Sequence, residues 1–232
     1  MTDTCGDLWQ AMSTARTIRR FTDEPVGEAV LARCLEAASW APSGANAQAW
    51  RFVVLRSPEL RAVVADAAAQ ALTVIEAAYS LTRPSDDDDS RRARDNRATY
   101  ELHDRAGEFT SVLFAQQRLR MASEQLLGGS IYPAMQNFLL AARGQGLGAC
   151  LTSWASYGGE PILRKAIGVP DDWMLAGHIV VGWPKGRHGP VRRKPWQSAV
   201  NADHWDEPAP DIAAATPLPS PPRESESAEN RG

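Results

Sequence analysis

Three arginines fall within five positions near the N-terminus, in the segment TARTIRRFTDEPV of a chain whose formal net charge is −3. Arg16, Thr17 and Arg19 supply two guanidinium groups and a hydroxyl group. Together with backbone N–H groups, these form a good receptor for a phosphate monoester. The alternative is an arginine-rich surface turn whose side chains pair with Asp23 and Glu24. The segment by itself leaves both interpretations open.

A second polar segment, WAPSGANAQAWRFVVL, follows a predicted amphipathic helix and leads into a predicted buried strand. Ser43, Asn46 and Gln48 lie in its loop. A loop held by rigid elements on both sides can present hydroxyl and amide groups to a planar heteroaromatic ring. By itself the segment could equally be a capped loop without a ligand.

Composition indicates one globular domain with an appendage. At 232 residues, 44% of them hydrophobic and 23% charged, the chain can bury a single core, and its net charge gives no reason to expect a nucleic-acid or membrane partner. We assign residues 1–206 to the domain. Residues 207–232 are rich in Pro, Ser and Glu, and we predict a disordered tail there.

Cysteine and histidine spacing indicates no metal site. Cys5, Cys34 and Cys150 form no CxxC pair, and the four histidines lie at no metal-ligand spacing. The N-terminus has no basic region followed by an apolar run, and no stretch approaches 18 consecutive apolar residues. We therefore expect a reduced, cytoplasmic setting.

Hydrophobic periodicity predicts helices that alternate with a few buried strands. The predicted helices cover residues 28–40, 59–78, 130–146 and 160–169, and the predicted strands cover residues 51–56, 110–115, 149–154 and 174–183. This alternation indicates a layered α/β or α+β domain.

Two further segments each allow two interpretations. Gly144, Gly146 and Gly148 resemble a dinucleotide fingerprint in composition, but they follow a helix and lead into a strand, so a helix stop with a tight turn is the better interpretation. The polar insertion at about 79–109 contains four consecutive aspartates, and we predict a solvated excursion or lid. Its flanking tyrosines, Tyr79 and Tyr100, could cover a bound ring or simply be exposed.

Four blocks in order resemble the FMN-dependent nitroreductase family. The first two are RTIRRFTDEPV and WAPSGANAQAWRFVV. The others are AMQNFLLAARGQGLGACLTS and VVGWPKGRHGPVRRKPWQSAVNADHW. The resemblance covers roughly residues 8–205, apart from the insertion, and several blocks in one order are far more specific than any single block.

The resemblance implies a three-layer α+β fold with a central mixed or antiparallel sheet flanked by helices. It also implies an intertwined homodimer with one FMN in each of two sites at the subunit interface. By position, the expected cofactor-binding residues are Arg16, Thr17, Arg19, Ser43, Asn46, Gln48, Thr152, Ser153, Arg192 and Arg193. Ser43, Asn46 and Gln48 would come from the other subunit, and Arg193 is the better match of the last pair. Many relatives carry an arginine in place of Ala15 and a proline in place of Ala49, which puts one phosphate contact and the loop backbone in doubt.

The implied reaction is a ping-pong hydride transfer. NADH or NADPH would reduce flavin N5, and an electron-poor small molecule such as a nitroaromatic or a quinone would then take the hydride. The cofactor carries the chemistry, so no side chain is assigned as catalytic. Alternatives on the same scaffold are reductive dehalogenation, dehydrogenation, flavin fragmentation, or flavin binding without turnover.

Overall fold

The computed structural model describes residues 4–119 and 123–215, and its center is one antiparallel sheet of four strands in the order β1-β2-β4-β3. The strands are β1 (Trp50–Leu55), β2 (Thr110–Gln117), β3 (Gly148–Thr152) and β4 (Trp173–Gly182). Every paired strand is antiparallel, so the α+β prediction is confirmed and the sheet is antiparallel, not mixed.

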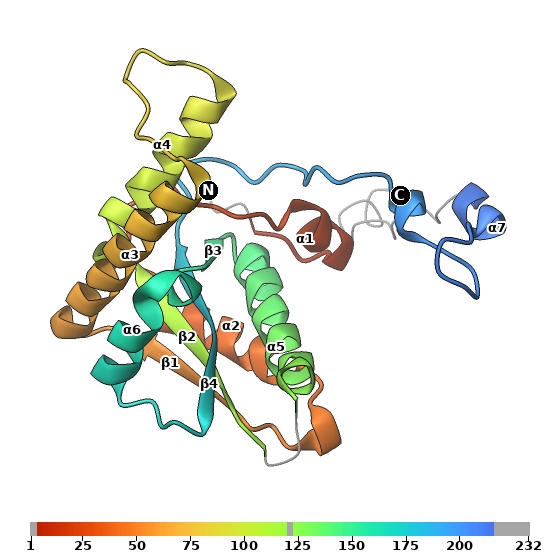
Figure 1. Cartoon of the computed structure of the whole chain (residues 1–232), viewed down its shortest axis with the longest axis horizontal. Coiled ribbons are helices and arrows are strands. Elements are labelled where there is room, and N and C mark those ends of the chain that lie inside the picture. Colours follow the sequence, from red (N-terminus) through yellow and green to blue (C-terminus); the bar gives the residue numbers. More distant parts are fainter. Residues whose placement is uncertain (1–3, 120–122, 216–232) are drawn as a thin grey trace, which may run out of the picture.

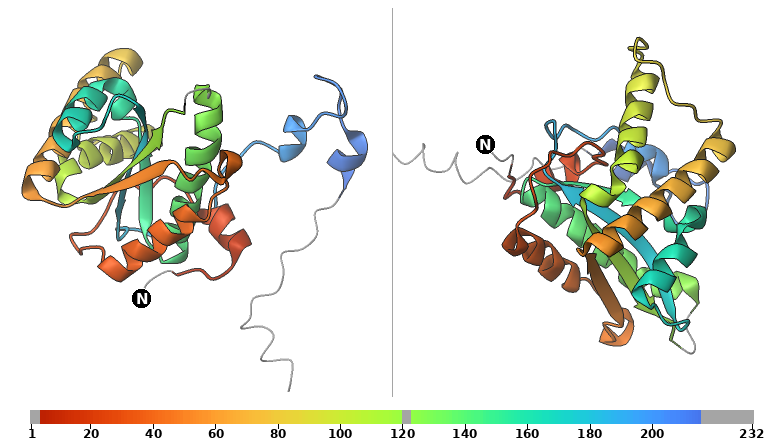
Figure 2. Two further views of the ribbon diagram at one scale, coloured as in Figure 1. Left: turned by 90° about the horizontal axis from the view of Figure 1, so that it is seen from below. Right: turned by 90° about the vertical axis from the view of Figure 1, so that its left-hand side faces the viewer.

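Helices cover both faces of this sheet, which gives three layers (Figures 1 and 2). The helices of eight or more residues are α2 (Glu28–Ser39), α3 (Pro58–Tyr79), α4 (Arg91–Asp104), α5 (Glu124–Gly144) and α6 (Glu160–Ile167). The shorter ones are α1 (Leu8–Thr14), η1 (Gly44–Asn46), η2 (Ala106–Glu108), η3 (Ala155–Gly159), η4 (Trp196–Ala199) and α7 (Pro210–Ala214).

Two apolar clusters hold the layers together. One lies between the sheet and α3, α6 and η3, and it includes Leu113, Trp154 and Val180. The other lies between the opposite face and α2 and α5, and it includes Phe114 and Phe138. Leu113 and Phe114 are consecutive in β2 and face opposite clusters, because successive side chains of a strand point to opposite faces.

α3 is a long apolar helix with clear start and stop signals. The Ser57 hydroxyl group accepts from the Leu60 N–H at its N-terminus, and Ser80 ends it in the left-handed conformation. Among the described residues it is the helix whose length and composition would also suit a membrane span. Its Val64 and Ala67, however, are buried in the core cluster, as expected for a helix that packs on a sheet.

The predicted excursion at 79–109 contains a packed helix, α4, of 14 residues. In α4, Tyr100, Leu102 and His103 are buried, and the Tyr100 hydroxyl group donates to the Glu76 carboxylate of α3 at 2.7 Å. The residues of the turn that precedes α4, with the four aspartates, are exposed. Tyr100 therefore belongs to the core and does not cover a ligand.

After residues 184–193, which contact the N-terminal segment, the chain leaves the body as a long arm, drawn in blue in Figure 1. This arm carries Trp205, which is 88% exposed, and the short helix α7. α7 falls inside the segment for which the sequence predicts disorder, and residues 216–232 of that segment lie outside the described residues.

Candidate active site

The arginine segment, residues 16–20, runs beside the edge strand β3 as an extended stretch. Thr17 forms a parallel bridge with Ala149, and the Ile18 N–H donates to the Ala149 carbonyl at 2.9 Å. Ile18 lies so close to Gly148 that a Cβ there would be 2.7 Å from Ile18 Cγ2. Gly148 is therefore a glycine because the arginine segment approaches its backbone.

Asp23 and Glu24, the partners expected for a surface turn, do not pair with Arg16 or Arg19. Asp23 pairs instead with Arg105 at the end of α4, and Arg20 pairs with Glu101 at 2.9 Å. Within residues 4–119 and 123–215, Arg16 and Arg19 have no carboxylate or hydrogen-bond partner. The interpretation as a surface turn held by local ion pairs is therefore wrong.

The basic segment after β4 returns to the same place. The Val191 N–H donates to the Ser13 carbonyl at 2.8 Å, and a Cβ on Gly189 would lie 3.8 Å from Arg16 Nη1. Arg193 thereby reaches the arginine segment from the opposite end of the chain. Arg192 does not line the same pocket, but its carbonyl accepts from Arg193 Nη1 at 2.9 Å.

These segments enclose a pocket of about 300 Å³, which we name the first basic pocket. Its polar and charged lining residues are Arg16, Thr17, Gln136, Arg143, His188 and Arg193. Its apolar lining comes partly from β3, whose Leu151 is 48% exposed. Three of the residues expected to hold a cofactor phosphate, Arg16, Thr17 and Arg193, are thus brought together.

Arg143 was not found by sequence reasoning. It is 2% exposed, it lies in the last turn of α5, and its Nε donates to the Thr14 hydroxyl group at 2.8 Å. A cation is favourable at this end of a helix. Only its place near the glycines that end α5 could have drawn attention to it.

The loop with Ser43, Asn46 and Gln48 is exposed and held in an unusual conformation. Ala45, Asn46 and Gln48 have φ values of 51°, 54° and 49°. The left-handed region is unfavourable for residues other than glycine and asparagine, and such residues concentrate at functional sites. The Ser43 hydroxyl group accepts from the Gln48 N–H at 3.0 Å, and Gln48 Nε2 donates to Asn46 Oδ1 at 3.0 Å. Hydrogen bonds within the loop therefore fix its conformation although the loop is exposed.

Thr152 and Ser153 end the edge strand β3. The Thr152 hydroxyl group donates to the His178 carbonyl at 3.1 Å, and the Ser153 carbonyl accepts from the Tyr157 N–H at 3.0 Å. Tyr157 lies in η3, a π-helical turn of the kind that is frequent at functional sites. Its hydroxyl group is 2.6 Å from that of Tyr79, which is exposed.

One chain does not bring all the predicted residues together. The Gly44 N–H donates to Ser130 near the start of α5, whereas Arg143 contacts Thr14 near its end. Thirteen residues of helix separate these contacts, which amounts to about 20 Å. Figure 1 shows η1 and α1 near opposite ends of α5. The 43–48 loop and the first basic pocket therefore lie apart on one chain.

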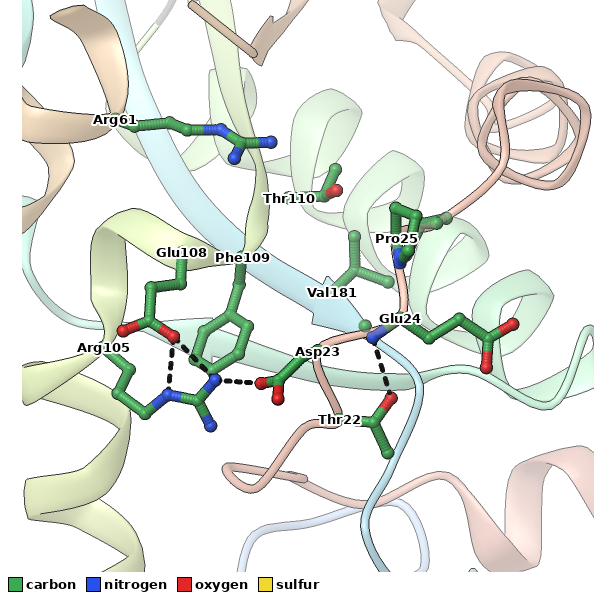
Figure 3. Close-up of a pocket in the computed structure, with 12 residues that line it drawn as sticks. Thr22, Asp23, Glu24, Pro25, Arg61, Arg105, Glu108, Phe109, Thr110 and Val181 are labelled. Carbon is green, nitrogen blue, oxygen red and sulfur yellow. Dashed lines mark hydrogen bonds and ion pairs between the residues drawn. The ribbon is translucent and has the colours of Figure 1, made fainter. Parts of the chain in front are cut away.

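A pocket of about 220 Å³ lies at the end of the sheet near Thr110 and Val181, away from the predicted site residues (Figure 3). Its Arg105 pairs with Asp23 and Glu108, so much of its charge is already balanced. Among the residues that the structure describes, no group of three or more His, Cys, Asp or Glu could hold a metal ion.

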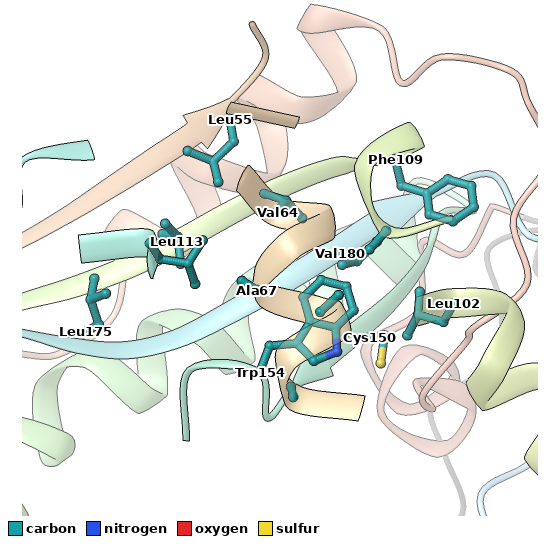
Figure 4. Packing of buried hydrophobic residues seen from close by; sticks show 14 of the residues in the cluster. Leu55, Val64, Ala67, Leu102, Phe109, Leu113, Cys150, Trp154, Leu175 and Val180 are labelled. Carbon is teal, nitrogen blue, oxygen red and sulfur yellow. The ribbon is translucent and has the colours of Figure 1, made fainter. Parts of the chain in front are cut away.

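Beneath Thr152, a buried aromatic network connects the sheet to α4. Trp154 lies within the core cluster (Figure 4), and its Nε1–H donates to His103 Nε2 at 2.9 Å. The Trp154 ring also meets the ring of His178 edge-on, with centroids 5.1 Å apart. Burial first of all, and also the charge of Arg19, lowers the pKa of His103, while a hydrogen bond to Thr99 opposes this shift.

His178 is fully buried, and neither ring nitrogen has a hydrogen-bond partner among the described residues. Burial lowers its pKa to about 3, because the imidazolium form would lose its hydration without gaining a partner. His178 is therefore a neutral core residue at physiological pH.

Comparison with known proteins places the chain in a family. Residues 12–183 match the Nitroreductase family, so the chain belongs to it. The 5,6-dimethylbenzimidazole synthase of Rhodospirillum rubrum is 29% identical over 189 residues, which cover 79% of this chain and 85% of that protein. The NADH dehydrogenase of Thermus thermophilus is 29% identical over 198 residues, which cover 84% and 95%.

Solved structures agree on the fold. A protein of Desulfovibrio desulfuricans, provisionally described as a nitroreductase and solved in complex with FMN, is 25% identical. The match covers 93% of this chain and 100% of that one, with a TM-score of 0.59. The nitroreductase-like fold is therefore shown by both sequence and structure.

Proposed function

We propose that the protein is an FMN-dependent oxidoreductase that takes hydride from NADH or NADPH and passes it to an electron-poor small molecule, such as a nitroaromatic or a quinone. The two substrates would use the site in turn, as in a ping-pong mechanism. Family membership supports the flavin chemistry, and the FMN complex of the D. desulfuricans protein supports the choice of cofactor.

The observation that carries this proposal is the first basic pocket. A phosphate monoester has nearly two negative charges at neutral pH, and the pocket gathers Arg16, Arg193 and the Thr17 hydroxyl group from segments far apart in the sequence. No carboxylate lines this pocket among the described residues, so an anion has no competitor there. The donor set therefore fits the phosphate of FMN.

The remaining predicted contacts would come from a second copy of the chain. The 43–48 loop is about 20 Å along α5 from the first basic pocket, so it is well placed to serve the pocket of a partner and not that of its own chain. Several large apolar side chains are exposed around the same elements, as expected for a surface that a partner covers. They are Leu8, Trp9, Met12, Trp40, Leu126 and Tyr132.

The residues of the chain would bind and orient the cofactor. Arg16, Thr17 and Arg19 would hold the phosphate and the ribityl chain, with Arg193 as a further basic contact, and Thr152 and Ser153 would border the ring at the end of β3. Bound FMN supplies the hydride-accepting and hydride-donating atom, so these side chains need only fix its position and its electrostatic field. Positive charge near the ring would favour a reduced, anionic flavin.

The alternative is a reaction that fragments the flavin, because one scaffold can host several flavin reactions. A relative named 5,6-dimethylbenzimidazole synthase, which aligns over most of both chains, shows that proteins similar to this one differ in their reactions. The two classes differ in the fate of the cofactor, which is recovered unchanged after hydride transfer.

Cofactor analysis and an anaerobic titration test the proposal. The purified protein should release FMN on denaturation, and NADH or NADPH should bleach the bound flavin. A nitroaromatic or a quinone should then restore the oxidised spectrum, with all the FMN recovered. Protein that binds no FMN, or flavin that neither donor reduces, would contradict the proposal, and loss of the FMN during turnover would favour the alternative.

A further inference from the structure

A second basic pocket, of about 290 Å³, lies on the other side of the arginine segment. It is lined by five cationic side chains, Arg16, Arg19, Arg20, Lys185 and Arg187, and by one carboxylate, that of Asp95. It shares Arg16 and Thr17 with the first basic pocket, so the two pockets adjoin. Such a concentration of positive charge is unexpected in a chain with a net charge of −3.

Three segments build this second basic pocket. Residues 184–187 follow β4 and pair with the end of the arginine segment, through a bridge between Phe21 and Pro184 and a 3.0 Å hydrogen bond from the Lys185 N–H to the Arg20 carbonyl. α4 supplies the third wall through Asp95 and Ala98. A backbone bridge and a backbone hydrogen bond therefore hold two of the three walls together.

The acidic groups nearby neutralise only part of this charge. Glu101 of α4 pairs with Arg20 at 2.9 Å and with Lys185 at 2.8 Å. Burial acts to raise the pKa of Glu101, but the Lys185 hydrogen bond and the neighbouring cations outweigh burial and lower that pKa. Asp95 lies 3.9 Å from Arg91 on its own helix, so its charge is partly compensated already.

Apart from Arg16, which also lines the first basic pocket, two cations of this pocket lack a partner among the described residues. Within the described ranges, 4–119 and 123–215, neither Arg19 nor Arg187 forms an ion pair or a hydrogen bond. Arg19 is also partly buried, and its charge acts on His103 and Cys150. Guanidinium groups without a carboxylate partner, in a concave site where five cationic side chains face the single carboxylate of Asp95, are suited to a phosphate.

We propose that the second basic pocket binds a phosphate group of the nicotinamide donor, with Lys185 and Arg187 as specificity-determining residues. This inference rests on the proposed function, because it assigns a docking place for the donor next to the flavin. A dinucleotide offers two phosphate sources, the pyrophosphate that NADH and NADPH share and the 2′-phosphate that only NADPH carries.

Titration calorimetry with FMN-loaded protein separates these sources. Adenosine 2′,5′-bisphosphate reports on the 2′-phosphate and ADP on the pyrophosphate, and both are compared between wild type and the Lys185→Ala/Arg187→Ala double variant. Removing two charge-assisted contacts should weaken one of the two ligands on the order of tenfold to a hundredfold. If only the bisphosphate is affected, KM for NADPH should rise by a similar factor with kcat unchanged. If ADP is affected, KM should rise for both donors.

Arg61→Ala is the matched control, because it removes an exposed arginine from the pocket of Figure 3 and should change neither ligand. Unchanged binding of both ligands in the double variant would overturn the inference while leaving the proposed function intact. Loss of FMN from the double variant would also overturn it, because Lys185 and Arg187 would then belong to the flavin site. A protein that holds FMN in every form but is reduced by neither donor would contradict the proposed function instead.

Discussion

Arg16 and Arg19 lack carboxylate partners among the described residues although Asp23 and Glu24 follow within a few positions. We therefore expect both arginines to contribute to FMN affinity. The double change Arg16→Ala/Arg19→Ala should weaken FMN binding by about 3–6 kcal/mol, or roughly a hundredfold to several ten-thousandfold, because two charge-assisted hydrogen bonds to the phosphate are lost. Riboflavin, which has no phosphate, should lose far less.

The measurement is the difference between FMN and riboflavin affinity in wild type and variant, with Arg56→Ala as control. Arg56 is exposed and pairs with Glu28 at 2.6 Å, so its loss should leave the difference unchanged. If the difference also survives the double change, these arginines do not hold the phosphate.

His178 predicts how stability depends on pH. Its pKa is about 3 in the folded chain and near 6.5 when unfolded, so between these values the unfolded state binds more protons. The free energy of unfolding should therefore fall as the pH drops below about 6.5, by up to about 1.4 kcal/mol per pH unit from this residue. In His178→Leu this contribution should vanish.

Chemical denaturation of both proteins from neutral to mildly acidic pH checks this. The difference in stability between variant and wild type should move in favour of the variant as the pH falls, and other titrating groups cancel in that difference. A difference that stays constant with pH would show that His178 is not buried as a neutral group.

At the scale of elements, the strands and the long helices could be predicted from sequence. The pattern for residues 51–56 and 174–183 found β1 and β4 to within a residue, because buried strands are short, apolar and β-branched. The insertion was harder. α4 is highly polar, and only four of its residues are buried, namely Ala93, Tyr100, Leu102 and His103. Their burial depends on tertiary contacts, such as those of Tyr100 with Glu76 in α3 and of His103 with Trp154, which a local sequence pattern does not reveal.

Candidate site residues could be selected from the sequence, but their arrangement in space could not. Arg16, Thr17 and Arg193 were selected by residue type and resemblance, and the structure places them around one pocket. The role of Arg143 and the existence of the second basic pocket could not be predicted, because both result from the way in which α5, α4 and residues 184–187 pack in three dimensions. The positive φ angles of the 43–48 loop were equally hidden, since Ala45 and Gln48 are not residues that predict a left-handed backbone.

Gly148 offers a test of how one strand positions the arginines. In Gly148→Ala the new Cβ would meet Ile18 Cβ at 2.9 Å and Ile18 Cγ2 at 2.7 Å, which is too close for any rotamer change to relieve fully. The arginine segment should then shift away from β3, and FMN content should fall. Gly129→Ala is the control, because nothing lies within 4 Å of its Cβ position. Equal FMN content in the two variants would show that this packing does not position the site.

At the scale of the whole molecule, the separation between the 43–48 loop and the first basic pocket leads us to expect a dimer. A large apolar interface of more than about 2,000 Å² in total is expected for an obligate assembly, and sedimentation should show no stable, flavin-loaded monomer. Such a monomer would contradict both the dimer and the shared site.

Mixed dimers test directly whether each FMN site is built from both subunits. One chain carries Arg16→Ala/Arg19→Ala and the other carries Ser43→Ala/Asn46→Ala/Gln48→Ala, so each homodimer is defective at both sites. In the mixed dimer, one site combines the altered arginines with the altered loop, and the other site combines the unaltered arginines with the unaltered loop. One FMN should therefore bind per mixed dimer with wild-type affinity, whereas sites built within single chains would give none.

α5 contacts the 43–48 loop through Ser130 and the first basic pocket through Arg143. In a dimer, this single helix would touch both cofactors, one at each end. Binding of the first FMN would then order elements that the second FMN also needs, and the second would bind more tightly, as expected when one ligand reduces the ordering cost for the next. Titration of the apo dimer with FMN should give a Hill coefficient above 1, whereas a simple hyperbola would show that α5 does not transmit occupancy between the sites.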